Sequence, residues 1–382
     1  MRVLILSDGI PPFVMGGMQR HTLNLTKYLV ELGIEIKLIH CYHEGEEKKS
    51  NEEVCRMIFG SNEKEGFASE LIEFPKPGKV PGHYIRRSYR YSKRVYEKVK
   101  DEVNDFDFVY IKGFSGWKLL EQKKHFKPKM GVNFHGYEMF QVSPDFKTKL
   151  KNQILIPPVQ KNLDPSDFIF SYGGGITDLL MQIGIASNRI VSINGAVDAV
   201  WFDQSSLLKS EKSKRLLFVG RFERRKGIEE LNEVLPELLN QYDFQMDFVG
   251  PIPEDKQIHN PKINYLGTIQ SVEEIKKVYS EHDILITPSY SEGMPNVIME
   301  AMSQGLAILA TDVGATRLLV DEMNGWLMSE MNIEILKSTL NDLLSSSEDQ
   351  IHVKKQKSLE KLDEKFSWPI VAQKHIDFLK SI

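Results

Sequence analysis

The sequence predicts an α/β protein built from two doubly wound parallel-sheet domains that face a central cleft. Short apolar runs alternate with longer amphipathic stretches, as expected for the strands and covering helices of parallel sheets. The alternation occurs in two blocks, and a polar stretch near residues 195–212 separates them. The chain has 382 residues. At about 150 residues per domain, this length allows two or three domains.

The first block contains strand-like runs that are rich in Val, Ile and Phe. Nearly continuous apolar runs are typical of strands covered on both faces. The runs are Val3–Leu6, Ile34–Ile39, Phe108–Ile111, Gly131–Phe134, Phe168–Phe170 and Ile190–Ile193. Leucines at helical spacing predict a helix over Met18–Leu32 that ends at Gly33. Residues 44–66 are rich in charge and poor in aromatic side chains, so we expect an irregular or mobile excursion there.

The second block repeats the scheme. The predicted strands are Leu216–Val219, Gln245–Val249, Ile263–Leu266, Ile284–Thr287 and Ala307–Ala310, and the predicted helices are Ile228–Leu239, Val272–Ser280, Pro295–Ser303 and Ile333–Leu344. A further break is expected at Phe366–Pro369, because Pro369 can restart a helix. We therefore predict an N-terminal domain of residues 1–195 joined by a C-terminal helix of about 368–382, and a C-terminal domain of residues 196–367.

Composition excludes several classes of protein. Two cysteines, Cys41 and Cys55, cannot staple a chain of this length, which excludes a disulfide scaffold and favours a reducing compartment. No apolar run approaches the roughly 18 residues of a membrane span. The first apolar run, Val3–Leu6, is too short for a signal peptide. We therefore expect a cytoplasmic protein.

The net charge of -4 combines two halves of opposite sign. Residues 1–200 carry 28 Lys and Arg against 24 Asp and Glu, whereas residues 201–382 carry 21 against 29. Within the first half, residues 76–100 hold nine basic residues and one acidic residue, Glu97. A small negative total therefore does not exclude an anionic partner.

Two interpretations fit this basic segment. One is a solvated helix face whose tyrosines pack inward. The other is docking on the inner face of an anionic cytoplasmic membrane or on a phosphate-bearing acceptor. The contact residues would then be Arg86, Arg87, Arg90, Lys93 and Arg94. Nucleic acid is not expected, because the chain has no recognised nucleic-acid module and a negative total charge.

Ligands of doubly wound sheets bind beyond the C-terminal ends of the strands, so the strand-to-helix loops are the candidate sites. The first loop holds Gly16-Gly17 at the start of a helix. Glycines there let backbone N–H groups approach an anion, although a turn that needs glycine explains the pair equally well. The loop is not G-x-G-x-x-G, so the dinucleotide fingerprint is absent.

A second loop, Gly220–Gly227, follows a predicted strand and precedes a helix. Arg221 stands at the strand end and Lys226 at the helix start. Two cations on one loop suit a diphosphate, because Arg grips oxygens through its fork and Lys acts as a mobile point charge. For Arg224 and Arg225 we expect solvated side chains instead.

A third loop runs from Ser289 into the helix that begins at Pro295 and ends at Gly305. It carries Glu292, and Glu300 follows eight positions later inside the helix. Neither carboxylate suits a phosphate, but both can accept hydrogen bonds from the diol of a ribose or hexose. The first N–H groups of the helix, at Asn296 and Val297, are free to bind phosphate. The loop therefore suits a nucleotide sugar.

These motifs resemble those of the retaining glycosyltransferases of family 4, which have the GT-B fold. Ser291-Glu292-Gly293-x-Pro295 followed by Glu300 resembles the E-x7-E signature of that family. Four further segments resemble its phosphate loop, its N-terminal glycine loop, its His-bearing acceptor loop and its inter-domain motif. They are Val219-Gly220-Arg221 with Lys226-Gly227, Gly16-Gly17, Asn133-Phe134-His135-Gly136 and Asn194-Gly195-Ala196-Val197-Asp198. The resemblance runs from near the start to Gly325-Trp326.

The resemblance implies a role for each matching residue. Arg221 and Lys226 would hold the donor diphosphate and stabilise it as leaving group. Glu292 would hold hydroxyls of the donor sugar, and His135 would contact the reacting sugar. These four are the predicted catalytic residues. The predicted donor-binding residues are Gly17, Arg221, Lys226, Glu292, Gly293, Met294, Pro295, Asn296, Val297 and Glu300, with Glu300 on the ribose.

The implied reaction is transfer of a sugar from a nucleoside-diphosphate sugar, with UDP favoured, to a hydroxyl of a glycan or glycolipid, with retention and without a metal. Bacterial surface polysaccharide or lipopolysaccharide biosynthesis is the expected setting. A sugar-nucleotide epimerase of the same fold, or an inactive nucleotide-sugar-binding partner protein, are the alternatives. Two departures weaken individual contacts. The inter-domain motif has one extra residue, and Gly314–Leu318 lacks the Gly-Gly-x-x-Glu that is common there.

No metal or other cofactor is expected. Asp105-Phe106-Asp107 has the D-x-D spacing of a metal site, but it precedes the strand Phe108–Ile111 and so stands at the wrong edge of the sheet. His40-Cys41-Tyr42-His43 lacks partner ligands at a spacing that zinc would need. Fixed cations and a helix N-terminus could stabilise the leaving diphosphate in place of a metal.

Overall fold

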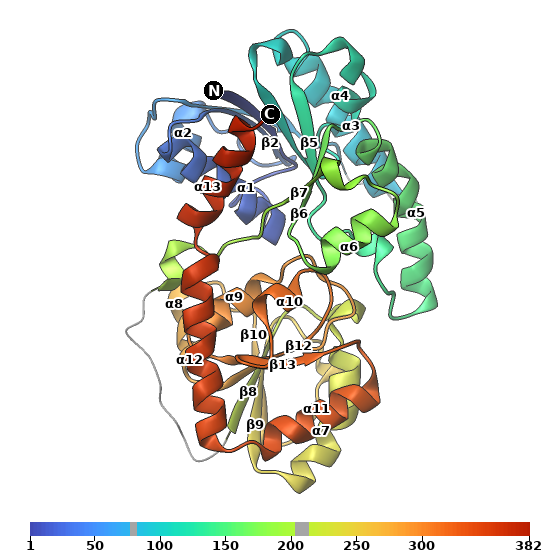
Figure 1. Ribbon diagram of the computed structural model, residues 1–382, viewed down its shortest axis with the longest axis vertical. Helices are drawn as coiled ribbons and strands as arrows, with labels where there is room; N and C mark the ends of the chain where they lie inside the picture. The colour runs from blue at the N-terminus through green and yellow to red at the C-terminus, as the bar shows by residue number, and fades with distance from the viewer. Residues whose placement is uncertain (77–81, 203–213) are drawn as a thin grey trace.

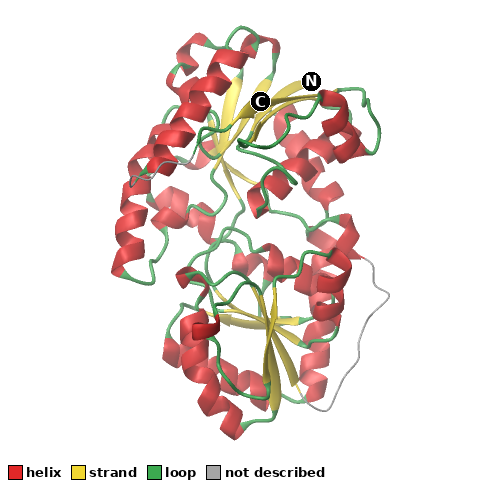
Figure 2. Ribbon diagram, turned by 180° about the vertical axis from the view of Figure 1, so that it is seen from behind, coloured by secondary structure: helices red, strands yellow, loops and turns green. Residues whose placement is uncertain are grey.

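The computed structural model describes residues 1–76, 82–202 and 214–382. The chain forms two parallel-sheet domains, one above the other (Figure 1). This arrangement confirms the predicted fold class. Viewed from behind, loops of both domains meet between the two sheets (Figure 2).

The first sheet has the strand order β3-β2-β1-β4-β5-β6-β7. All its neighbouring strands are parallel, and β1 lies between β2 and β4. The order reverses at β1, which is the position where doubly wound sheets open a ligand crevice. The strands are β1 (Arg2–Leu6), β2 (Glu35–Tyr42), β3 (Phe67–Glu73), β4 (Phe108–Lys112), β5 (Lys129–Asn133), β6 (Phe168–Ser171) and β7 (Ile190–Ser192).

Helices cover both faces of this sheet, which explains why its strands are apolar throughout. One face is covered by α1 (Gly17–Glu31), α2 (Asn51–Phe59) and the C-terminal helix α13 (Trp368–Lys380). The other face is covered by α3 (His83–Val99), α4 (Trp117–Glu121), α5 (Phe146–Leu163) and α6 (Gly175–Gln182). Short 3₁₀ turns lie at Val103–Asp105, Lys123–His125, Glu138–Phe140, Ser187–Arg189 and Ala199–Phe202.

The second sheet has the order β10-β9-β8-β11-β12-β13 and is also parallel. Its strands are β8 (Lys214–Val219), β9 (Phe244–Val249), β10 (Ile263–Gly267), β11 (Ile284–Thr287), β12 (Ala307–Thr311) and β13 (Gly325–Met328). Its helices are α7 (Ile228–Gln241), α8 (Val272–Ser280), α9 (Asn296–Ser303), α10 (Thr316–Leu319), α11 (Ile333–Ser345) and α12 (Glu348–Lys365), with 3₁₀ turns at Arg224–Lys226 and Glu254–Lys256.

The chain crosses between the domains twice. The first crossing follows β7, and residues 203–213 of the predicted linker lie outside the described residues. The second is the step from α12 to α13, which returns the C-terminus to the first domain (Figure 1). There Trp368 stacks on Tyr28 of α1 with ring centroids 5.8 Å apart. The N–H of Val197 donates to the carbonyl of Phe366 at 2.9 Å, which ties the two crossings together.

Local structure differs from expectation in residues 44–66. Instead of a wholly irregular excursion, this part of the chain contains α2. Ser50 and Glu53 form a capping box at its start, and Gly60 ends it in a left-handed conformation. Val54, Cys55 and Ile58 give the helix a buried face. Charged residues on the exposed face hid this short amphipathic pattern.

Several further elements, including the short helices α4, α6 and α10, were not predicted. The edge strands β3 and β13 and the helix α5 are all present. Both missed strands lie at a sheet edge, where coverage is less complete, although the edge strands β7 and β10 were predicted. Helix α5 contains Pro157 and Pro158, which argue against a helix in sequence. No helix in the described parts of the chain has the length and apolarity to cross a membrane.

Candidate functional site

The site lies where the strand-to-helix loops of the two domains meet. A pocket there is lined by the first domain's Gly17 and Arg20 and by the second domain's Met294, Asn296 and Glu300. A side-chain carbon at position 17 would come within 3.4 Å of Asn296 Nδ2. The glycine loop after β1 and the start of α9 therefore face each other closely. Several residues of the predicted donor site are thus brought together from opposite ends of the chain.

Glu300 lies on α9 and faces this pocket with its carboxylate enclosed. Its Oε1 lies 3.4 Å from Arg20 Nη1 across the domain interface, and Tyr279 donates its hydroxyl to Oε2 at 3.3 Å. Burial raises the pKa of Glu300, and Arg20 and Tyr279 oppose that rise. Arg20 is a functional candidate that the sequence motifs did not indicate. Both contacts are long, so the carboxylate retains capacity to accept from a ligand hydroxyl.

Glu292 is the most strongly held carboxylate of the site. Its Oε1 accepts from Lys226 Nζ at 2.6 Å and from Ser289 Oγ at 2.9 Å. Burial works against ionisation, but the charges of Lys226 and Arg225 outweigh it and lower the pKa of Glu292. Glu292 is therefore ionised, and Lys226 stands directly beside it rather than free in the pocket. The two were predicted to bind different parts of the donor, and the structure pairs them.

The loop that carries Lys226 can take this course only with glycine at its end. Gly227 has a φ of 70°, and a side-chain carbon there would lie 1.9 Å from the carbonyl oxygen of Pro288. That clash would push the loop away from the segment that leads to Glu292. Gly227 thus permits the contact between the second and third loops.

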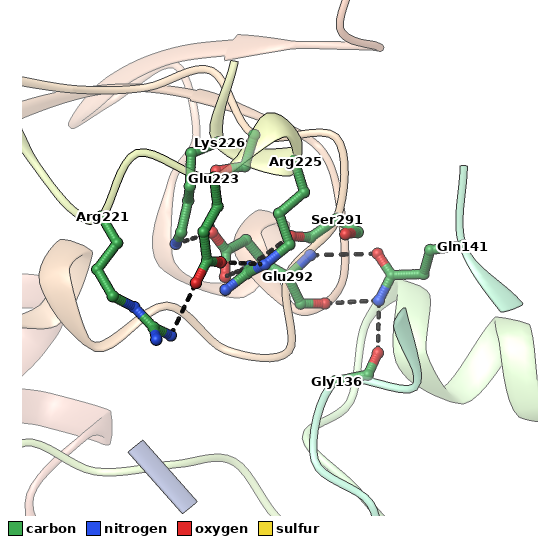
Figure 3. Close-up of polar contacts among 9 residues, drawn as sticks. Gly136, Gln141, Arg221, Glu223, Arg225, Lys226, Ser291 and Glu292 are labelled. Atoms are coloured by element: carbon green, nitrogen blue, oxygen red, sulfur yellow. Dashed lines mark hydrogen bonds and ion pairs between the residues drawn. The ribbon is translucent and has the colours of Figure 1, made fainter. Parts of the chain in front are cut away.

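Arg224 and Arg225 of the second loop form ion pairs, so the prediction that their side chains are solvated is wrong. Arg225 was expected to be solvated, yet its guanidinium lies 3.4 Å from Glu292 Oε2 and 2.9 Å from Glu223. Arg224 likewise forms an ion pair with Glu230 of α7. Arg221 is the exposed member, since its side chain is 73% accessible and pairs with Glu223 at 3.0 Å. Lys226 and Arg225 converge on Glu292, whereas Arg221 stands apart from them (Figure 3).

His135 follows β5 and adopts an unusual backbone conformation with a φ of 62°. Its N–H donates to Asn133 Oδ1 at 2.7 Å, and its Nδ1 contacts the hydroxyl of Tyr172. Burial lowers the pKa of His135 well below the usual value, and the nearby Lys112 adds to this. The ring is therefore neutral. Among the described residues, none hydrogen-bonds to its buried Nε2, which leaves that atom able to meet a ligand.

The loop that bears His135 packs against the third loop of the other domain. A side-chain carbon at Gly293 would lie 3.0 Å from the Cα of Gly136. Gln141 joins the same two loops. Its amide donates to the carbonyls of Glu292 at 2.6 Å and Gly136 at 2.5 Å, and its Oε1 accepts from the N–H of Glu292 at 3.2 Å (Figure 3). Gln141 therefore clamps the backbone of Glu292 from across the cleft.

The remaining predicted donor residues lie around this contact. Met294 Sδ accepts from the N–H of Gly195 at 3.0 Å, so it also touches the crossing segment. Pro295 is the N-cap of α9, and Asn296 and Val297 supply its first N–H groups. These N–H groups have no acceptor within the helix and stand at its positive end.

A buried lysine lies behind His135. Lys112 at the end of β4 is fully buried, and its Nζ lies 3.1 Å from His21 Nδ1 and 4.2 Å from the centre of the Tyr110 ring. Burial lowers the pKa of Lys112 well below the usual value. His21 and His375 lie beside it, and burial lowers their pKa as well. No sequence motif indicated this cluster, because its members are spread over the whole chain.

The basic segment forms α3 on the outer face of the first domain, and its residues 77–81 lie outside the described residues. Several of its cations have local partners. Arg87 donates to the carbonyl of Pro75 at 2.6 Å, Arg94 pairs with Glu73 at 3.1 Å, and Lys93 lies over the Tyr89 ring. Arg90, Lys93 and Arg94 line a shallow open hollow with Lys76. None of these residues, nor Arg86, reaches the pocket around Glu300.

Asp107 of the D-x-D sequence lies at the edge of the sheet opposite the site. Its Oδ2 accepts from the N–H of Arg2 at 2.7 Å, at the start of β1. The described ranges contain no group of three or more His, Cys, Asp or Glu side chains placed to hold a metal.

Both domains match models of glycosyltransferases. Residues 15–200 match the model described as "Glycosyltransferase Family 4", and residues 213–346 match "Glycosyl transferases group 1". The chain belongs to the glycosyltransferases. Spore coat protein SA of Bacillus subtilis is 25% identical over 77% of this glycosyltransferase and 84% of that protein.

Solved structures share the fold of this glycosyltransferase over its whole length. Sucrose-phosphate synthase of Thermosynechococcus elongatus superposes with a TM-score of 0.80 at 16% identity, covering 100% of this chain and 98% of that one. Anabaena HepE in complex with UDP gives 0.68 at 13% identity, with 100% of both chains covered. The lipopolysaccharide outer core galactosyltransferase WaaB gives 0.68 at 14% identity, covering 100% and 99%.

Proposed function

We propose that this glycosyltransferase transfers a sugar from a nucleoside-diphosphate sugar, with UDP as the favoured nucleotide, to a hydroxyl of a glycan or glycolipid with retention of configuration. The observation that carries the proposal is the cleft where loops of the two domains meet. The loop of Glu292, whose carboxylate pairs with Lys226 and Arg225, packs against the loop of His135, and Gly17 faces the start of α9. Such a cleft offers cations for a diphosphate and carboxylates for hydroxyl groups. The UDP in HepE supports the choice of nucleotide.

The chemistry follows from the charges. When the bond between the sugar C1 and the diphosphate oxygen breaks, negative charge grows on the diphosphate. Lys226 and Arg221 stand on one loop and would stabilise that charge, Lys226 by exchanging Glu292 for the diphosphate as its partner. The N–H groups at the start of α9 would add a fixed dipole. The acceptor's proton would pass to the leaving diphosphate oxygen on the same face, so no protein nucleophile is required.

Glu292 and His135 would position the donor sugar. Glu292 is ionised and buried, so it can accept from sugar hydroxyls once a diphosphate competes for Lys226. The neutral ring of His135 carries an unpaired Nε2 that suits a hydroxyl. Glu300 would take the two hydroxyls of the ribose. No metal enters this scheme, because fixed cations meet the charge of the diphosphate.

The acceptor belongs to surface polysaccharide or lipopolysaccharide biosynthesis in this proposal. WaaB, which shares the fold, is named for the lipopolysaccharide outer core. The cationic side chains of α3, namely Arg86, Arg87, Arg90, Lys93 and Arg94, would contact an anionic acceptor or the inner face of the cytoplasmic membrane.

A thermal-shift screen of UDP, GDP and ADP tests the donor assignment. A nucleotide at about 100 times its dissociation constant adds about 2.7 kcal/mol to the free energy of unfolding. Transfer to isolated bacterial glycolipids is then measured with the sugar nucleotides of the nucleotide that binds. An epimerase would release a changed sugar nucleotide without any acceptor, and an inactive partner would bind without turnover.

Two variants and a chelator test the site. Lys226→Ala and Glu300→Ala should both lose most turnover, and near-wild-type turnover in both would show that the site is wrongly assigned. Activity should persist in EDTA. Loss of activity in EDTA that Mn²⁺ restores would contradict metal independence.

A further inference from the structure

Helix α5 exposes a row of apolar side chains. Phe146 is 81% exposed, Leu150 52% and Ile154 54%, and Val142 just before the helix is 69% exposed. Residues four apart lie on one side of a helix, so these side chains form a single stripe. Isolated exposed apolar residues are ordinary, but a continuous row on one helix marks a contact surface.

The stripe is flanked by unopposed positive charge. Helix α5 carries Lys147, Lys149, Lys151 and Lys161 and contains neither Asp nor Glu. At 100° per residue, Lys149 falls on one side of the stripe and Lys147 and Lys151 on the other. In the described parts of the chain, none of these lysines forms an ion pair. The nearest carboxylate in sequence, Asp145, is engaged as the N-cap, where it accepts from the N–H of Thr148 at 2.7 Å.

The opposite side of α5 anchors the helix in the first domain. Val159 and Leu163 belong to the core beneath the sheet, so the helix cannot turn its apolar stripe inward. The stripe is therefore a permanent feature of the surface. In Figure 1 the helix runs along the flank of the first domain and extends toward the second.

A groove opens beside this helix. Lys147, Thr148, Lys151, Asn152 and Leu155 of α5 line it together with Glu223, Arg224, Arg225 and Ser291 of the donor-side loops. Arg225 also contacts Glu292, so the groove leads to the cluster proposed to bind the donor. Whatever surface α5 lies on is therefore close to that cluster.

We propose that α5 lies flat in the surface of an anionic lipid bilayer, with Phe146, Leu150 and Ile154 among the acyl chains and the flanking lysines at the headgroups. An apolar stripe bordered by lysines is the pattern of an interfacial helix. The lysines match anionic headgroups, and their apolar stems can reach up to them. A soluble polyanion would contact the lysines but not the apolar stripe. An acidic protein partner is the alternative, and the experiment below distinguishes it from a bilayer.

The proposal deepens the proposed function, because docking along α5 would present a lipid-linked acceptor at the groove. It differs from docking through α3, where Glu73 and Glu70 already pair with Arg94 and Lys98. The docking proposal depends on the proposed function only in assuming that the acceptor is linked to a lipid. Binding to lipid is measured without donor or acceptor, so docking and transfer can fail separately.

The test is co-sedimentation of the full chain with vesicles of phosphatidylcholine, alone or mixed with an equal amount of phosphatidylglycerol. The chain should bind the mixed vesicles far better, and high salt should weaken binding without abolishing it, since the apolar contact remains. Equal binding to both vesicles would overturn the proposal. So would capture by an acidic protein in the absence of any binding to vesicles.

Variants locate the surface. Phe146→Ser with Leu150→Ser should weaken binding at least ten-fold, because two large apolar side chains no longer enter the bilayer. Lys149→Glu should weaken it by more than the about five-fold expected for loss of one charge. The matched controls lie on the second domain, where Val353→Ser on α12 and Lys277→Glu on α8 should leave binding unchanged. All five positions are exposed, and an unchanged melting temperature verifies folding.

Two further measurements test whether α5, rather than α3, contacts the bilayer. If Arg90→Glu with Lys93→Glu on α3 abolishes binding while the α5 variants retain it, the proposal is wrong. Phe146→Trp provides a direct readout. Brominated lipids in the mixed vesicles should quench its added fluorescence, because the ring lies among acyl chains. Unquenched added fluorescence would place the stripe outside the bilayer.

Discussion

Replacing Glu300 by Gln tests whether this carboxylate recognises the ribose of the donor. The substitution keeps the shape of the side chain but replaces one carboxylate oxygen by an amide donor, so one of two acceptors for the ribose diol is lost. In the structure Glu300 has only long contacts to Arg20 and Tyr279, which leaves its capacity for a ligand. A hydrogen bond to a charged group contributes about 1.5–3 kcal/mol. We therefore expect UDP to bind about 10- to 150-fold more weakly to Glu300→Gln.

The assay is a double-mutant cycle in which both the carboxylate of Glu300 and the ribose diol of the nucleotide are removed, singly and together. Isothermal titration compares UDP with 2′,3′-dideoxy-UDP on the wild type and on Glu300→Gln. Removal of the diol should weaken binding to the wild type by a similar factor and should scarcely affect binding to the variant. Glu330→Gln, at an exposed site outside the pocket, is the matched control. If the dideoxy nucleotide loses the same affinity on both proteins, Glu300 does not bind the ribose.

Further predictions concern the cation pair, the clamp and a buried histidine. Lys226→Met should lower kcat about 100-fold or more, because a fixed cation beside the leaving group is lost. Steady-state transfer assays check this, and an equal loss in Lys276→Met would show a nonspecific effect. Gln141→Ala removes three hydrogen bonds, two of them across the cleft, and should lower kcat/KM about ten-fold, whereas Gln153→Ala, on exposed α5 surface, should not. Burial lowers the pKa of His40 to about 4 from 6.5. Between pH 6.5 and pH 4 the unfolded state binds a proton at His40 and the folded state does not. The free energy of unfolding therefore falls by about 3 kcal/mol as the pH decreases from 6.5 to 4, whereas above pH 6.5 His40 causes no such loss. Urea unfolding at pH 7 and pH 4 should therefore show a smaller acid loss for His40→Leu than for the wild type, and equal losses would contradict the assignment.

Much of the fold is encoded locally and is readable from sequence. The inner strands of both sheets are short apolar runs, because each is covered on both faces and meets no water. The structure confirms the doubly wound class that these runs predicted. Four of the elements that escaped prediction have one exposed side or a contrary local signal. They are the edge strands β3 and β13, the capped helix α2, and α5 with its two prolines.

The spacing of Glu292 and Glu300 was also visible in sequence, because one loop and one helix carry both. Their partners were not visible. Lys226 precedes Glu292 by 66 residues, Gln141 precedes it by 151, and Arg20 precedes Glu300 by 280. The pairs made by Gln141 and Arg20 form only when loops of the two domains meet, and the pair of Lys226 with Glu292 forms only when two distant loops of the second domain meet. No local pattern encodes either contact.

The sequence by itself determined the two-domain α/β class and the loops that hold the chemistry, since strand burial and helix capping are properties of neighbouring residues. Only the tertiary structure decided which charges meet. It paired Lys226 and Arg225 with Glu292, left Arg221 exposed, and gathered Lys112, His21 and His135 in one buried cluster. The physical reason is that burial and pairing set the state of an ionisable group, and both depend on contacts made across the fold.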